Sequence, residues 1–212
     1  MLTTKIRRYT LSLIYLLSML SITTHSIADV SSAENGNSDQ SKFNIVSREQ
    51  WGAAKPIFAM TIQIPSRTTI HHTATKQNPN KTIAQKLKGL QAFSQRSEKL
   101  ADGRTKKAWA DLPYHFYIDH KGTVAEGRDI QFIGDTNTSY NPSGHIAVVL
   151  EGNFESEMPT HNQIASLKGL LTFLKKKYNI EEKSIGTHQD FAQTACPGRN
   201  LLKILENEGL IN

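Results

Sequence analysis

Cysteine is almost absent from this chain, since Cys196 is the single one among 212 residues. A disulfide framework, an iron–sulfur cluster and an all-cysteine zinc site within one chain are therefore excluded. Glycine and proline number 13 and 7 and follow no fixed period, which excludes collagen-like and solenoid architectures. With 38% hydrophobic and 21% charged residues, the chain can form a buried core, and its length suits one domain with tails.

A long apolar run is also missing. The apolar stretch from Leu11 to Ile22 is shorter than the roughly 20 residues that cross a bilayer. It follows a basic segment, Lys5 to Arg8, and precedes Ser26-Ile27-Ala28, whose small residues suit signal peptidase. We therefore predict a signal peptide over residues 1–28 and an exported protein, periplasmic or secreted, without a stable membrane anchor after cleavage. An uncleaved anchor helix is the alternative, and the lack of cysteine here excludes a lipoprotein anchor.

The excess of positive charge is small once the signal peptide is removed. The whole chain has 25 Lys and Arg against 19 Asp and Glu, a net charge of +6. Residues 1–28 contain three basic and no acidic side chains, so 22 basic and 19 acidic residues remain, a net charge of about +3. This balance gives no electrostatic basis for binding nucleic acid, and we expect no nucleic-acid partner.

The remaining chain divides into a leader and one domain. Asp29 to Lys42 is polar, with only Val30 and Ala33 as aliphatic residues, so we predict a flexible leader over residues 29–43. We expect a single domain over residues 44–212, a monomer by default. The apolar patterns predict strands at 67–72, 145–151 and 184–188, and a hairpin that pairs 114–118 with 122–125. A loop is expected at 100–107. Helices are predicted at 82–100 with Asn80 as N-cap, at 160–177 with a capping box of Thr160 and Gln163, and at 197–205 with Pro197 as the first residue. Because strands alternate with helices, we predict an α/β domain whose central mixed β-sheet is flanked by helices.

One segment carries residues that suit a metal ion. His188 ends a predicted strand, and Cys196 follows eight residues later, just before a predicted helix. The helix dipole favours the thiolate that a metal requires. The pair His71-His72 at the end of another strand is the natural source of a third ligand, although alternation allows only one of the two to face the site. Two imidazoles and one thiolate on zinc leave a coordination position open, as in catalytic sites.

Two other interpretations of Cys196 are consistent with spacing alone. The thiol is either buried and inert, or the nucleophile of a Cys–His hydrolase. In an oxidising compartment, an unpaired cysteine is a liability unless a partner engages it. This favours the metal ligand.

Five segments occur in an order that resembles a known family. They resemble the zinc-dependent N-acetylmuramoyl-L-alanine amidases of the type-2 class, which include peptidoglycan-recognition proteins and phage T7 lysozyme. The resemblance covers Ile45 to Leu205, nearly the whole domain. The segments are Ser47–Ala53 (SREQWGA), Thr69–Ala74 (TIHHTA), Trp109–Phe116 (WADLPYHF), Gly122–Arg128 (GTVAEGR) and Thr187–Gly198, which holds THQD and CPG.

The resemblance implies a zinc enzyme with its metal in a surface groove. One Zn²⁺ per chain would be held by His71, His188 and Cys196, and family members that bind peptidoglycan without cutting it typically lack this cysteine. Tyr114 and Thr194 match catalytic positions of the family. The implied substrate is peptidoglycan or a muropeptide, cut between the lactyl group of N-acetylmuramic acid and L-alanine. A binding module without activity is the rival interpretation.

Other polar residues receive less specific expectations. His72, His115 and Trp51 match family positions with structural or substrate-lining roles, and we expect His72 and Trp51 to contact substrate. Arg128 is a candidate partner for a carboxylate of the stem peptide. For Glu151 a salt bridge or an edge position is favoured over catalysis, and His145 and His161 are expected at the surface or as capping residues.

Overall fold

A computed structural model of the protein describes residues 44–100 and 103–211. The predicted signal peptide (1–28) and leader (29–43) lie outside the described residues. The first described elements are a short strand, β1 (Ile45–Val46), and a one-turn helix, α1 (Arg48–Trp51), which the sequence patterns did not predict. Ser47 and Gln50 form a capping box at the start of α1.

A six-stranded mixed sheet forms the centre of the domain, in the order β1-β6-β5-β7-β2-β8. Neighbouring strands run in parallel except β5 and β6, which form the predicted antiparallel hairpin. The predicted strands and the mixed sheet are confirmed: the bounds of β2 are as predicted, and the ends of the other predicted strands differ by at most two residues. The bounds are β2 (Arg67–His72), β5 (Phe116–Ile118), β6 (Val124–Glu126), β7 (His145–Leu150) and β8 (Ile185–Thr187).

Helix α2 (Ile83–Ser94) is shorter than predicted and has a different N-cap. The N-cap is Thr82 rather than Asn80, because Thr82 and Gln85 exchange reciprocal hydrogen bonds in a capping box. The helix ends before residue 100 because the following chain pairs as strands β3 (Glu98–Lys99) and β4 (Thr105–Lys106). The described part of the predicted loop at 100–107 therefore includes a strand.

The two C-terminal helices differ in how well their starts were predicted. Helix α3 (His161–Tyr178) has the predicted capping box of Thr160 and Gln163. Two 3₁₀ turns, η1 (Glu182–Ser184) and η2 (His188–Asp190), flank β8. Helix α4 (Arg199–Asn207) has Gly198 as its N-cap, so the prediction that Pro197 opens the helix is wrong.

Within the described ranges, every helix is too short or too polar to cross a membrane.

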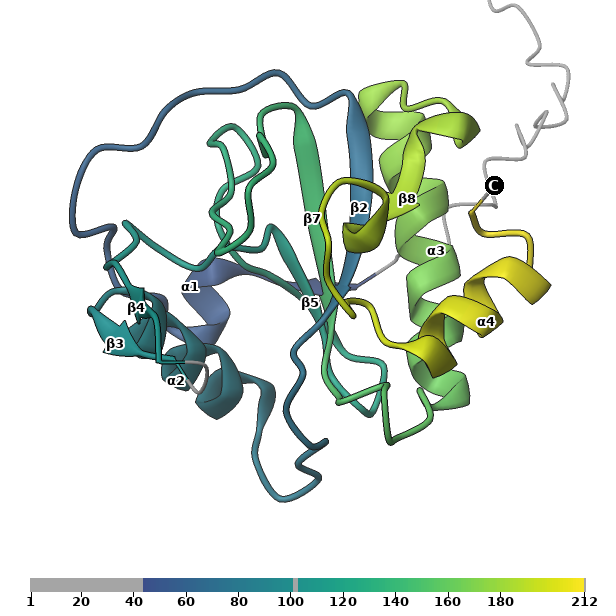
Figure 1. The fold of residues 1–212 in the computed structure, drawn as a ribbon, viewed down its shortest axis with the longest axis horizontal. Helices are drawn as coiled ribbons and strands as arrows, with labels where there is room; N and C mark the ends of the chain where they lie inside the picture. The colour runs from purple at the N-terminus through teal and green to yellow at the C-terminus, as the bar shows by residue number, and fades with distance from the viewer. Residues whose placement is uncertain (1–43, 101–102, 212) are drawn as a thin grey trace, which may run out of the picture. The chain divides into compact units, whose positions relative to one another are not determined.

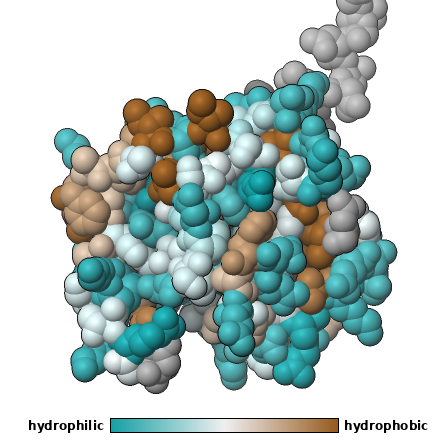
Figure 2. All heavy atoms as spheres, turned by 45° about the horizontal axis from the view of Figure 1, so that its top comes forward, coloured by the Kyte–Doolittle hydropathy of each residue, from teal (hydrophilic) through white to brown (hydrophobic). Residues whose placement is uncertain are grey.

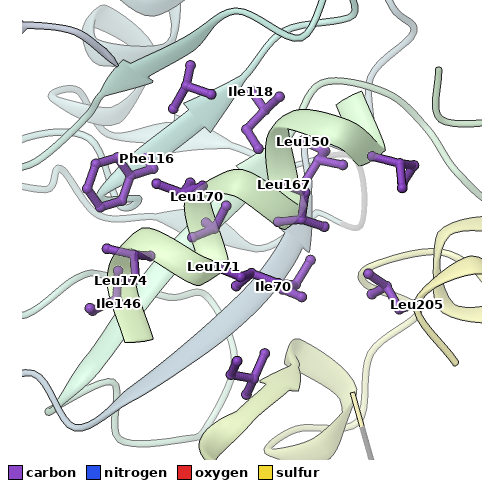
Figure 3. Packing of buried hydrophobic residues seen from close by; sticks show 14 of the residues in the cluster. Ile70, Phe116, Ile118, Ile146, Leu150, Leu167, Leu170, Leu171, Leu174 and Leu205 are labelled. Carbon is purple, nitrogen blue, oxygen red and sulfur yellow. The ribbon is translucent and has the colours of Figure 1, made fainter. Parts of the chain in front are cut away.

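Helices cover both faces of the sheet, with α1 and α2 on one side and α3 and α4 on the other (Figure 1). Because successive side chains of a strand point to opposite faces of the sheet, neighbouring strand residues belong to two different hydrophobic clusters, one on each face. Figure 3 shows the larger cluster, where leucines of α3 and α4 meet strand residues such as Ile70, Ile118 and Leu150. The intervening residues Tyr117 and Val149 pack in the other cluster, with Trp51 of α1 and Leu87 of α2.

Exposed apolar side chains concentrate in the connection between α1 and β2. Figure 2 shows apolar residues in a few separate groups among hydrophilic ones on the face it views. Among the large hydrophobic residues that the structure describes as exposed, Ile57, Phe58, Ile62 and Ile64 lie in this connection, and only Met158 lies elsewhere. The sheet and its helices therefore bury most of the large apolar side chains of the described chain.

Candidate metal centre

Three potential metal ligands meet at the carboxyl ends of strands β2 and β8. His71 is the penultimate residue of β2, and His188 directly follows β8. These two strands pair in parallel, so their carboxyl ends lie at the same edge of the sheet. Cys196 lies in the segment between η2 and α4. The potential ligand atoms of the three residues lie within 4.8 Å of one another, so the structure brings together the set expected from sequence.

The two adjacent histidines of β2 point to opposite faces of the sheet, as strand alternation requires. The ring of His71 lies near His188 and Tyr114, at centroid distances of 4.7 and 5.3 Å. The ring of His72 instead lies 6.1 Å from Phe154, and its Nδ1 accepts a hydrogen bond of 3.2 Å from the Phe154 N–H. The side chain of His72 is therefore not part of the cluster.

The contacts of the Cys196 sulfur fit a tetrahedral metal site. Sγ lies 3.6 Å from Nδ1 of His71. Zinc–sulfur and zinc–nitrogen bonds of about 2.3 and 2.0–2.1 Å at a tetrahedral angle would separate the two ligand atoms by about 3.6 Å. The other ring nitrogen of His71, Nε2, is buried and has no hydrogen-bond partner among the described groups. Two imidazoles and one thiol are donors that suit Zn²⁺.

Burial keeps all three potential ligands in their neutral forms. It lowers the pKa of His71 well below its usual value, and the neighbouring His188 adds to this effect. Burial also lowers the pKa of His188. It raises the pKa of the Cys196 thiol to about 12, against the opposing effect of the His72 N–H. The imidazoles are thus available as neutral ligands at pH 7, and the thiol would release a proton on binding a metal.

Tyr114 lies beside the cluster, just before β5. Its ring is tilted by 54° to that of His71. Burial raises the pKa of its phenol, and the proximity of Cys196 raises it further. The phenol therefore stays protonated at neutral pH and can donate a hydrogen bond next to the cluster.

Thr194 contacts the cluster through the backbone of Cys196. Its Oγ1 accepts a hydrogen bond of 3.2 Å from the Cys196 N–H. This contact orients the segment that carries the thiol. The hydroxyl proton of Thr194 is not used in it, so the side chain can still act as a donor.

A second loop approaches the cluster from the connection between β6 and β7, and sequence analysis missed it. Oγ1 of Thr138 lies 2.7 Å from Nε2 of His188. The ring of Tyr140 packs against His188 at a centroid distance of 5.2 Å. Threonine and tyrosine are common residues in loops, so neither suggests a role at a metal site. No sequence pattern indicates that residue 138 contacts residue 188.

Two residues expected to contact substrate are buried and bonded to the protein itself. Trp51 is 1% exposed, and its indole N–H donates to the Glu126 carbonyl at 2.7 Å. Arg128 is 3% exposed, donates to the Leu112 carbonyl at 2.7 Å and forms an ion pair with Asp135. With their polar atoms engaged inside the fold, Trp51 and Arg128 have structural roles in place of the expected substrate contacts.

Two further histidines are structural. His115 is buried, accepts a hydrogen bond at Nδ1 from the Ala147 N–H and donates from Nε2 to the Phe132 carbonyl, at 2.9 and 2.8 Å. His145, expected at the surface or as a capping residue, is buried instead, with its Nδ1 2.6 Å from Thr69 Oγ1. The prediction for His145 is wrong because residues distant in the sequence, such as Thr69, pack around the side chain and bury it. His161 opens α3 and is exposed.

Glu151 forms the salt bridge favoured from sequence. Its Oε2 lies 2.7 Å from Lys86 Nζ, and both side chains are 4% exposed. The same carboxylate accepts hydrogen bonds of 2.9 Å from the backbone N–H groups of Asn78 and His120. All of these partners belong to the protein, so Glu151 organises the loops around the carboxyl end of β7.

The sequence matches the family model described as N-acetylmuramoyl-L-alanine amidase over residues 62–199. It is 31% identical over 160 residues to peptidoglycan-recognition protein SC2 of Drosophila simulans, covering 74% of this chain and 82% of the relative. It is 35% identical over 111 residues to the endolysin of Enterobacteria phage T3, covering 50% of this chain and 71% of the endolysin.

Solved structures share the fold. Drosophila peptidoglycan recognition protein SD superposes with a TM-score of 0.65 and 26% identity, covering 77% of this chain and 93% of that one. The N-acetylmuramoyl-L-alanine amidase LysC from Clostridium intestinale URNW superposes with a TM-score of 0.60 and 26% identity, covering 78% and 97%. The relatives thus include both recognition proteins and amidases.

Proposed function

This chain belongs to the N-acetylmuramoyl-L-alanine amidase family, and we propose that it hydrolyses the amide bond between the lactyl group of N-acetylmuramic acid and L-alanine. The substrate is peptidoglycan or a muropeptide derived from it. The observation that carries the proposal is the cluster of His71, His188 and Cys196, with potential ligand atoms within 4.8 Å. Three protein ligands are typical of catalytic rather than structural zinc sites.

The cluster would hold one Zn²⁺ per chain. When bound, zinc supplies a Lewis acid for the scissile carbonyl and lowers the pKa of a water molecule towards about 7. The neutral imidazoles of His71 and His188 act as ligands without losing a proton, whereas Cys196 binds as the thiolate.

Tyr114 and Thr194 are the catalytic donors in this proposal. The phenol of Tyr114 stays protonated because burial raises its pKa, so it donates a hydrogen bond to the oxyanion that forms at the scissile carbonyl. Thr194 accepts from the Cys196 N–H and donates its own hydroxyl proton towards the same developing charge. The third expected substrate contact, His72, supplies its backbone N–H to the sulfur rather than its side chain to the substrate.

Recognition without cleavage is the second candidate, because the chain is similar to peptidoglycan-recognition proteins such as SC2. The complete set of His71, His188 and Cys196 favours cleavage over recognition alone. A thiol hydrolase is disfavoured, because burial raises the pKa of Cys196 to about 12 and a thiol nucleophile must be deprotonated.

The place of action follows from the predicted N-terminus. The predicted signal peptide over residues 1–28 supports export to the periplasm or the medium, where peptidoglycan lies, and a monomer is the default expectation. Export is tested by N-terminal sequencing of the protein recovered from these fractions. A mature chain that starts at Asp29 supports cleavage after Ala28, and a chain retained uncleaved in the membrane contradicts it.

The activity is tested with the purified protein and defined muropeptides, analysed by mass spectrometry. We expect free stem peptides that begin with L-alanine, lost after treatment with a chelator and recovered on addition of Zn²⁺. Product that survives the chelator but disappears in Cys196→Ser would assign the nucleophile to sulfur. Tight binding without any product would assign recognition alone.

A further inference from the structure

The ring of His188 is held from the side by the loop between β6 and β7. Oγ1 of Thr138 lies 2.7 Å from Nε2 of the imidazole. Tyr140 packs against the same ring, with centroids 5.2 Å apart and planes tilted by 57°. The ring thus has both a polar contact at one nitrogen and an apolar contact along its surface.

The two loop residues are themselves fixed in place. The Thr138 N–H donates to Oγ1 of Thr136 at 3.1 Å, and the two hydroxyl oxygens lie 2.8 Å apart. Tyr140 stacks on Phe191, with centroids 5.9 Å apart and planes tilted by 26°. Because each contact is supported by a second one, the Thr138 hydroxyl is placed before any ligand binds.

The contact with Thr138 determines which nitrogen of His188 is available. A neutral imidazole carries one N–H and one lone pair, on different nitrogens. Where Nε2 carries the proton and donates to Thr138, the lone pair lies on Nδ1. A histidine that binds a metal generally donates from its other ring nitrogen to an oxygen acceptor, which sets the tautomer and the orientation of the ring.

We propose that Thr138 is a positioning residue for the metal centre. Its hydroxyl accepts a hydrogen bond from Nε2–H of His188 and thereby presents Nδ1 of that ring to the cation. Thr138 acts through His188 and does not contact substrate. The inference rests on the proposed zinc function, because the effect of Thr138 is on zinc binding. The tautomer of His188 is a property of the protein without metal and can be measured separately.

The first test measures zinc affinity by competition with a chromogenic chelator. Thr138→Val removes the hydroxyl and keeps the shape, and we expect it to weaken zinc binding by about 10- to 100-fold, the usual effect of losing such a partner. Thr138→Ser keeps the hydroxyl and should bind zinc nearly as the unaltered protein does. Thr172→Val removes an exposed threonine hydroxyl that bonds within α3 and serves as the control. Equal affinities of the Val variant and the unaltered protein, or equal losses in Val and Ser, would overturn the proposal.

The second test observes the ring nitrogens directly in metal-free protein, with long-range ¹H–¹⁵N NMR spectra of the imidazoles. We expect His188 to carry its proton on Nε2 in the unaltered protein, and to mix both tautomers in Thr138→Val. A proton on Nδ1 in the unaltered protein would overturn the proposal. A protein with the Nε2–H tautomer and Thr138-dependent zinc binding but no amidase activity would instead overturn the proposed function and leave the role of Thr138 in place.

Discussion

The backbone N–H of His72 donates a hydrogen bond to Sγ of Cys196 over 3.4 Å, although 124 positions separate the two residues. An N–H donor stabilises negative charge on the sulfur, so this contact favours the thiolate that a metal requires. The side chain of His72 points away from the cluster, towards Phe154. One residue of the His71-His72 pair therefore supports the site through its ring and the other through its backbone.

Cys196→Ser should abolish zinc-dependent stabilisation. Zinc at about 100 times its dissociation constant stabilises the unaltered protein by about 2.7 kcal/mol, which raises the Tm of a chain of this size by about 5–10 °C. The hydroxyl of serine is a far weaker zinc ligand than a thiolate, so the variant should show no shift. Thermal unfolding with and without Zn²⁺ measures the difference. A normal zinc shift in Cys196→Ser would show that the sulfur is not a ligand.

Tyr114→Phe should reduce turnover without affecting zinc. The loss of one oxyanion donor lowers kcat by about 10²–10³, whereas the aromatic ring remains to pack against the smaller cluster of the core. Steady-state kinetics on a muropeptide and chelator competition measure the two effects. Tyr178→Phe, at the end of α3, is the matched control. An unchanged kcat in Tyr114→Phe would remove Tyr114 from the mechanism.

Glu151→Gln should destabilise the fold and leave the chemistry intact. The substitution removes the nearer of two buried carboxylates from Lys86, the one at 2.7 Å, and leaves the ammonium with Asp119 at 3.6 Å. Loss of one member of a buried ion pair costs up to about 3–5 kcal/mol, and the remaining Asp119 reduces this cost, so we expect a fall in Tm of about 5–10 °C. Activity per folded molecule should stay within about twofold, because the partners of Glu151 are structural.

The matched control for the buried pair is an exposed one. Lys168 and Glu208 form an ion pair at 2.6 Å, with both side chains 44% exposed. Solvent screens such a pair, so Lys168→Met should change the free energy of unfolding by less than about 1 kcal/mol. If Glu151→Gln instead lost kcat while its Tm stayed unchanged, Glu151 would belong to the catalytic machinery.

The metal-free protein should lose stability as the pH falls from about 6.5 to about 4. Burial lowers the pKa of His115 from 6.5 to about 4, so in this window the unfolded chain binds a proton that the folded chain does not. The stabilising contribution of neutral His115 to the free energy of unfolding is fully present above pH 6.5. About 3 kcal/mol of this contribution is lost by pH 4. His145, whose pKa burial also lowers to about 4, acts in the same direction.

Urea unfolding at several pH values measures this dependence, and His115→Gln is the informative variant. Gln cannot take up the proton, so the variant should be less stable at pH 7.5 but should lose less stability on acidification. A slope equal to that of the unaltered protein would show that His115 does not contribute.

Elements with strong local patterns could be predicted from the sequence. The β-branched strand β2 and the capped helix α3 were found within one or two residues of their bounds, because apolar periodicity and capping act over a few neighbouring residues. The short β1 and α1 were missed, since two or four residues carry too little pattern. The N-cap at Thr82 was missed because Asn80 is an equally good capping residue in isolation.

The sequence by itself determined the potential ligands, namely His188, Cys196 and the pair His71-His72, from which the family resemblance selected His71. It also determined the strands that carry the histidines, because these depend on residue chemistry and local spacing. Only the tertiary structure decided that Arg128 and His145 are buried and that Thr138 reaches His188 across 50 positions. Such contacts depend on how the sheet and its loops pack, and no local pattern encodes that packing. The potential ligands could therefore be recognised in the sequence, and the groups that position them could not.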